Sequence, residues 1–69
     1  MKTLINKKTG AGHYEITVME NHFELGKFET TDMDLVSLID EYRQFGSIDE
    51  NDKFENFEEM YEYCKNKIN

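Results

Sequence analysis

The chain has 69 residues, a net charge of −7 at pH 7 and a pI near 4.6. A chain this short forms a single domain, residues 1–69, and buries only ~60% of the surface that the unfolded chain exposes. The acidic balance disfavours direct binding to nucleic acids and to anionic membranes, and it favours partners with a basic surface. No run of apolar residues is long enough to cross a bilayer.

The cysteine content and the first residues both favour the cytoplasm. The chain has one cysteine, Cys64, which cannot form an internal disulfide, whereas secreted domains of this size usually need several. Residues 1–6 lack the apolar segment and the cleavage site of a secretory signal peptide. We therefore expect a cytoplasmic protein.

Residues 1–29 predict an antiparallel meander. Three segments are rich in strand-forming residues and are separated by turn residues. The predicted strands are 2–6, 13–20 and 23–29. The first turn, at 8–12, has two glycines that tolerate a positive φ, and the second turn, at 20–22, contains an asparagine that also does. Short turns of this kind connect antiparallel neighbours.

The alternation of side chains indicates which face of the sheet is buried. Along the second strand, Tyr14, Ile16 and Val18 alternate with Glu15, Thr17 and Met19. We expect the first set to face the core and the second set to face water. In the third strand Phe23 and Leu25 share a face, and Phe28 is out of phase with them. We therefore predict a β-bulge near Gly26–Lys27, which returns Phe28 to the core side.

From Thr31 the apolar pattern takes a helical period. Thr31 and Asp34 have the spacing of a capping box with an acid in its last position, and Asp32 adds a favourable charge at a helix N-terminus. Apolar residues then recur at helical spacing, at Leu35, Leu38, Ile39, Tyr42 and Phe45. Gly46 follows them, where a helix commonly ends in a left-handed glycine. We predict a helix over residues 32–45.

A second amphipathic helix is predicted over residues 53–68. Its apolar face consists of Phe57, Met60, Tyr61, Cys64 and Ile68. Two N-cap pairs are compatible with its start, namely Asp52 with Glu55 and Asn56 with Glu59. The helix therefore begins between residues 53 and 57, and in the second case Phe54 packs against its first turn.

Three strands followed by two helices, each with one apolar face, predict an α+β fold. The element order is βββαα, and a three-stranded antiparallel sheet carries both amphipathic helices on one face. This arrangement buries the apolar face of every element against another element.

Residues that bind metals or carry out catalysis are sparse and unfavourably spaced. The acidic segment 49–52 invites comparison with a calcium loop, but the glycine and glutamate of an EF-hand are missing at the sixth and twelfth positions. His13, His22 and Cys64 are the soft metal ligands, and no short spacing pairs them. We interpret the histidines, which fall in or beside the two predicted turns, as partly exposed turn residues, and Cys64 as a small core residue. We expect no metal, no cofactor and no enzymatic activity, because a small core leaves little room for a substrate pocket.

The strongest functional feature is the acidity of the segment that contains both helices. Residues 32–62 hold eleven acids and two bases, Arg43 and Lys53. If the apolar helical faces point inward, the acids point outward. The candidate partner-binding residues are Asp40, Glu41, Glu55, Glu58, Glu59, Glu62 and Tyr63. Carboxylates on helices that rise ~1.5 Å per residue can mimic the phosphates of a nucleic acid, and the alternative is an ordinary solvated surface.

The chain resembles the small acidic proteins with which phages and mobile elements inhibit host defence, anti-CRISPR proteins among them. The likeness lies in the whole chain, which is short, free of proline, begins with Met1, is rich in Lys, Asn, Ile and Glu, and places strands before helices. It implies a nucleic-acid mimic that blocks the nucleic-acid site of a larger effector, in the host cytoplasm if a phage encodes it. It carries no motif, so no residue role is transferred.

We therefore expect a non-enzymatic inhibitor or adaptor. Its acidic helical face docks on a basic, nucleic-acid-binding surface of a larger protein, and it binds neither nucleic acid nor membrane itself. The alternative is a small structural or assembly module, such as a homodimer or a phage component, that associates through a sheet edge or an apolar patch. Salt weakens charge-driven docking far more than apolar association, so the two functions differ in their salt dependence.

Overall fold

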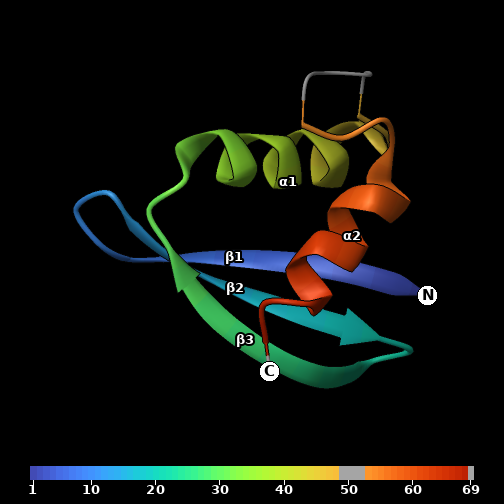
Figure 1. The fold of residues 1–69 in the computed structure, drawn as a ribbon, viewed down its shortest axis with the longest axis horizontal. Coiled ribbons are helices and arrows are strands. Elements are labelled where there is room, and N and C mark those ends of the chain that lie inside the picture. The colour runs from blue at the N-terminus through green and yellow to red at the C-terminus, as the bar shows by residue number, and fades with distance from the viewer. Residues whose placement is uncertain (49–52, 69) are drawn as a thin grey trace.

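The computed structural model describes residues 1–48 and 53–68. The elements are β1 (Lys2–Gly10), β2 (His13–Glu20), β3 (Phe23–Thr30), α1 (Met33–Phe45) and α2 (Phe57–Lys65). The strands pair antiparallel in the order β1-β2-β3, and both helices lie on one face of the sheet (Figure 1). The predicted α+β fold with element order βββαα is confirmed. The calcium loop considered for residues 49–52 lies outside the described residues.

β1 is longer than the sequence predicts. The strand continues to Gly10, past its predicted end, because it pairs with β2 along its polar half, where Lys8 lies opposite Tyr14. The turn is correspondingly short, and its Gly12 has a φ of 72°. Gly10 lies within the strand, at a shift in register after Lys8. Of the two glycines in the predicted turn, Gly12 is therefore the one that uses a positive φ.

The second turn forms where the sequence predicts it. Asn21 and His22 both adopt the left-handed region, with φ values of 52° and 72°. Two consecutive left-handed residues are typical of a type I′ turn, whose twist matches that of the paired strands. Asn21 also holds the start of the chain, because its side chain accepts a hydrogen bond from the N-terminal amine of Met1. Its backbone N–H donates to the Met1 carbonyl at 2.9 Å.

The bulge in β3 lies one residue earlier than predicted. Val18 lies opposite Gly26 and Met19 lies opposite Glu24, so Leu25 is the extra residue. A Cβ atom on Gly26 would lie 3.0 Å from the Ile68 side chain, so Gly26 faces the covered side of the sheet. The bulge still brings Phe28 to the core, as predicted. Phe23 and Leu25 stay outside the core and are 74% and 43% exposed.

Helix α1 begins at Met33, one residue after the predicted start. Its N-cap is Asp32 and not Thr31, because the Asp32 side chain accepts hydrogen bonds from the backbone N–H groups of Asp34, at 3.1 Å, and Leu35, at 3.2 Å. An aspartate at this position satisfies two helical N–H groups that lack intrahelical partners. The predicted end is confirmed, since Gly46 has a φ of 80° and its N–H donates to the Tyr42 carbonyl at 2.7 Å.

Helix α2 uses the later of the two predicted starts. Asn56 is its N-cap, and the Asn56 side chain accepts a hydrogen bond from the Glu59 backbone N–H at 3.0 Å. The helix ends at Lys65, before the predicted end at Ile68. Ile68 continues beyond the helix and packs over Gly26 of β3. The apolar residue that looked like a fifth helical position therefore belongs to a short C-terminal segment that covers the sheet.

The core lies between the covered face of the sheet and the two helices. The sheet contributes Leu4, Ile16 and Val18, each at most 1% exposed. The other buried apolar residues are Leu35, Val36, Ile39, Ile48, Phe54, Met60, Tyr61 and Cys64. Cys64 is confirmed as a core residue, and its burial raises the pKa of the thiol to about 12. Leu38, which the helical pattern also places inward, is half-buried.

Candidate functional site

The net charge of the described residues belongs to one of the two layers. We define the sheet layer as residues 1–31 and the helical layer as the described residues 32–48 and 53–68. The sheet layer has four acids and four bases, whereas the helical layer has eight acids and four bases. The negative charge of the described residues is therefore carried by the helical layer, which contains all of the predicted partner-binding residues.

The outward position of the predicted acids follows from the burial of the opposite helical faces. Ile39 of α1 and Met60 of α2 are at most 1% exposed and fix which side of each helix faces the sheet. Five predicted acids are exposed, namely Asp40, Glu55, Glu58, Glu59 and Glu62. Glu41 is half-buried. Their role in binding a partner stays a prediction.

Lys2 of β1 pairs with two of these acids. Its Nζ atom lies 3.0 Å from Glu58 Oε2 and 3.9 Å from Glu62 Oε2. It also lies 5.4 Å from the centre of the Tyr61 ring, within the range of a cation–π contact. The hydrogen bond to Glu58 raises the pKa of Lys2 above its usual value. The carboxylates of Glu58 and Glu62 are therefore held on one flank of α2, facing β1.

Asp40 of α1 contacts the same strand. The side-chain amide of Asn6 donates a hydrogen bond to Asp40 Oδ1 at 2.7 Å. Lys2 and Asn6 are four residues apart on the covered side of β1, which separates them by ~13 Å. Asp40, Glu58 and Glu62 thus form a row along β1, which we call the β1 row.

The remaining predicted residues lie away from this row. Glu59 follows Glu58 on α2, so its side chain is rotated by ~100° about the helix axis. Tyr63 is 39% exposed and contacts two side chains, the Phe54 ring at a centroid distance of 5.3 Å and Lys67 Nζ at 5.1 Å from its own centroid. We call the four other predicted residues, Glu41, Glu55, Glu59 and Tyr63, the outer group.

Aromatic stacking fixes the two helices relative to each other. The Tyr42 ring of α1 stacks on the Phe57 ring of α2, with a centroid distance of 3.8 Å and an interplanar angle of 16°. Phe57 also contacts Tyr61 at 5.9 Å. The first turn of α2 is therefore held against the last turns of α1, so the acids of both helices keep a fixed arrangement.

An ion pair at the start of α1 removes one acid from the available charge. Lys53 Nζ lies 2.5 Å from Asp32 Oδ2, and the hydrogen bond from Lys53 lowers the pKa of the Asp32 carboxyl. The backbone N–H groups of Leu35 and Asp34 act in the same direction. Asp32 serves as helix cap and ion-pair partner, which leaves it less suited to bind a partner protein.

Sequence reasoning missed the contacts between the layers that organise the site. Lys2 and Glu58 are 56 residues apart, and no short-range pattern connects them. The available signal was the period of two along β1, which places Lys2, Leu4 and Asn6 on one side of the strand. With Leu4 recognised as a core residue, the two polar residues beside it are expected at the edge of the helical layer.

The described residues offer little for metal or membrane binding. Within residues 1–48 and 53–68, no group of three or more His, Cys, Asp or Glu side chains is arranged to hold a metal ion. His22 is exposed in the second turn, and His13 is exposed as the first residue of β2. No helix in this part of the chain has the length and apolar character needed to cross a membrane.

No protein-family model matches this chain, and no curated protein or solved structure is significantly similar to it.

Proposed function

We propose that this protein binds, without catalysis, a basic and nucleic-acid-binding surface of a larger protein, and that the helical layer is its binding surface. The observation that carries the proposal is the separation of charge, since the described residues of the helical layer include eight acids and four bases while the sheet layer is balanced. An acidic layer on a neutral scaffold orients the molecule as it approaches a basic partner, and it speeds association.

The β1 row supplies a spacing that suits nucleic-acid mimicry. Asp40 and Glu58 are tied to Asn6 and Lys2, which are ~13 Å apart along β1. One strand of duplex DNA carries a phosphate every ~3.4 Å along the axis, so this distance spans about four phosphates. Side chains that are held in place before binding lose less conformational entropy when a partner binds them.

Lys2 limits the negative charge that the β1 row offers to a partner. It neutralises part of the charge of Glu58 and Glu62 in the free protein. An arginine of a partner can replace it, because a guanidinium binds a carboxylate with two parallel hydrogen bonds and an ammonium group does not. Glu55 and Glu59 are exposed acids of the outer group, so they add charge for the first encounter.

The resemblance to small acidic inhibitors of host defence agrees with this function. It implies that the partner is a nucleic-acid-binding effector and that binding blocks its nucleic-acid site, as an anti-CRISPR protein does. Acidic residues and a small α+β domain are what the two have in common.

A charge-matched pair of variants tests the proposed function. The partner is captured with the tagged protein from a cell lysate, identified by mass spectrometry and purified, and its affinity is then measured by calorimetry. Glu55→Lys with Glu59→Lys changes the helical layer, and Glu20→Lys with Glu24→Lys makes the same change of net charge in the sheet layer. We expect the first pair to weaken binding at least tenfold and the second to change it less than threefold.

Two further measurements complete this test. Circular dichroism melts check that both variants fold, and nucleic acid added to the complex should displace the protein. Equal losses of affinity in the two variants, or a complex that binds nucleic acid as well as the free partner does, would show that the helical layer is only a solvated surface.

A further inference from the structure

One face of the sheet points away from the helices and carries a shallow pocket. Successive strand residues alternate between the two faces, and Leu4 and Val18 face the helices. Thr3, which lies opposite Met19, therefore faces the other way. Within residues 1–48 and 53–68, no helix or strand lies over this second face (Figure 1). The pocket has a volume of about 150 Å³. Its lining residues are Met1, Thr3, Ile5, Met19 and His22.

Three of the five lining residues carry a soft donor atom. Met1 and Met19 each have a thioether sulfur, and His22 has an imidazole. Thioether sulfur selects copper(I) over harder ions, and imidazole also suits copper. None of the five is an aspartate or a glutamate, the side chains that bind calcium and magnesium. Groups of His, Cys, Asp and Glu that could hold a metal are absent from the described residues, whereas this pocket combines a histidine with methionine sulfurs.

The strand register brings the two sulfurs within reach of one ion. Lys2 lies opposite Glu20, and the backbone N–H of Asn21 donates to the Met1 carbonyl at 2.9 Å, so Met1 lies beside Asn21. Met1 and Met19 are then diagonal neighbours on one face of the sheet, and residues in such positions are ~7–8 Å apart. Methionine is unbranched and has three rotatable bonds, so the two side chains can close this separation around a single ion.

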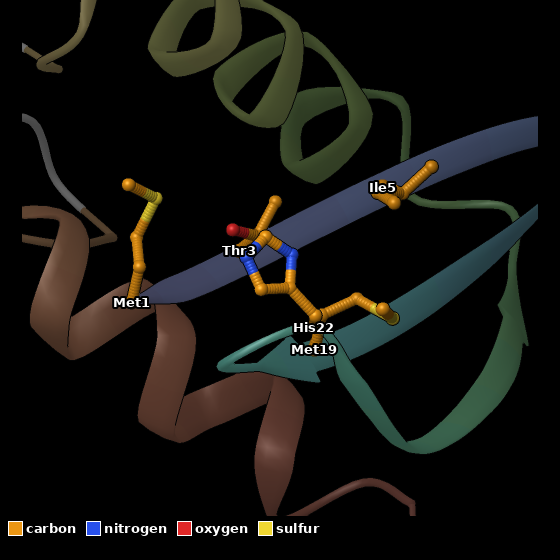
Figure 2. Close-up of a pocket in the computed structure, with 5 residues that line it drawn as sticks. All are labelled: Met1, Thr3, Ile5, Met19 and His22. Carbon is orange, nitrogen blue, oxygen red and sulfur yellow. The ribbon is translucent and has the colours of Figure 1, made fainter.

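The second turn places the imidazole between the two methionines. His22 has a φ of 72°, which fixes its backbone in the left-handed region. Figure 2 shows its ring between the side chains of Met1 and Met19, at the centre of the residues that line the pocket. The turn therefore presents the imidazole to the space that both sulfurs can reach.

We propose that Met1, Met19 and His22 form a binding site for copper(I), with two thioether sulfurs and one imidazole nitrogen as ligands. The net charge of −7 raises the local concentration of cations. The thiol of Cys64 is withdrawn from competition, because it is 0% exposed and burial raises its pKa to about 12. The site lies on the side of the sheet opposite the helical layer, so this inference does not depend on the proposed function.

Silver(I) tests the site, because it has the charge and the ligand preference of copper(I) and is stable in air. The protein is labelled with ¹³C at its methionine methyl groups and titrated with silver nitrate in a chloride-free buffer. We expect the NMR signals of Met1 and Met19 to shift until about one equivalent is bound. Met33, on α1, is 46% exposed and serves as the internal control, so its signal should stay in place. Silver bound at Cys64 would instead shift Met60, one turn away on α2.

Matched variants measure what the donor atoms contribute. Met19→Leu removes the sulfur at a similar side-chain volume, and we expect the dissociation constant for silver(I) to rise at least about tenfold. Met33→Leu makes the same change on α1 and should leave this constant within about threefold. His22→Asn keeps a residue that tolerates the left-handed region and should weaken binding as much as Met19→Leu does. Circular dichroism melts check that each variant folds.

Two other ions test which metal the site prefers. Copper(I), kept reduced with ascorbate under argon, should give the same pattern of shifts as silver(I), and zinc(II) should leave the methionine signals in place. The proposal is overturned if silver(I) shifts Met33 as readily as Met19, if it shifts Met60 alone, or if zinc(II) gives the same shifts. It is also overturned if the folded Met19→Leu and His22→Asn variants bind silver(I) as tightly as Met33→Leu does.

Discussion

The sheet layer and the helical layer are built from similar lengths of chain, but they differ in how their structure is determined. In the sheet layer, short turns such as Asn21-His22 set the strands, and acids and bases balance. In the helical layer, the periodicity of apolar residues determines which segments form helices, and contacts with the sheet determine where these helices lie. The layer with the net charge is therefore arranged by the layer without it. The most useful experiments are those that change the connections between the two.

The largest effect is expected from the apolar boundary between the layers. Ile39 of α1 is 1% exposed and packs in the core, so Ile39→Ala should lower the free energy of unfolding by ~2–5 kcal/mol. Phe45, on the same helix, is 70% exposed, and Phe45→Ala should change it by no more than ~0.5 kcal/mol. Urea denaturation of both variants measures the difference. Similar losses would mean that α1 presents a different face to the sheet.

The second largest effect on stability is expected where Ile68, in the segment after α2, packs against β3. A Cβ atom on Gly26 would lie 3.0 Å from the Cδ1 atom of Ile68, so Gly26→Val should destabilise the protein by ~1–3 kcal/mol through overpacking. Ile68→Ala removes the side chain in the way, so the double variant should be more stable than the sum of the single effects predicts. A double-mutant cycle from thermal melts measures this coupling. Simple additivity would show that Ile68 does not cover the sheet.

The parts of the fold that depend on neighbouring residues were predictable from the sequence, and the parts that involve residues distant in the sequence were less so. The Asn21-His22 turn and the helix end at Gly46 depend on the residues beside them, and both are where the sequence predicts them. Gly26, next to the bulge, is covered by Ile68, and the cap at Asp32 is reinforced by Lys53. These partners are distant in the sequence, so local patterns placed the bulge and the cap one residue away from their observed positions.

The candidate site was predictable to the same extent. Helical periodicity was sufficient to place the acids on the outside of the helices, because it depends only on which faces are apolar. It could not divide them into the β1 row and the outer group. That division depends on Lys2 and Asn6, which reach the helical layer from the first strand of the sheet.

A smaller effect is expected from a hydrogen bond between the layers. The hydroxyl of Tyr61, on α2, donates to the Met19 carbonyl of β2 at 2.9 Å. Tyr61→Phe removes only this bond and should lower the free energy of unfolding by ~0.5–1.5 kcal/mol. Tyr63→Phe serves as the control, because Tyr63 is partly exposed and should tolerate the change. If chemical denaturation gives equal stabilities for the two variants, the tyrosine does not hold α2 to the sheet.

The smallest effect is expected at Asp32, where the sheet layer ends and the helical layer begins. The hydrogen bond from Lys53 lowers the pKa of Asp32 below its usual 3.8, so the folded state gains stability from the charged carboxylate above that pH and loses it as the pH falls further, through the lowered pKa. Asp32→Asn keeps an oxygen that caps α1 but does not titrate. The difference in unfolding free energy between the wild type and this variant should therefore be constant from about pH 7 to 5 and shrink from about pH 4 to 2. Lys53→Gln removes the main cause of the lowered pKa. Its free energy of unfolding should therefore depend less on pH than that of the wild type in the same denaturation series. A difference that does not change with pH would mean that Asp32 acts as a helix cap alone, and that its charge does not link the layers.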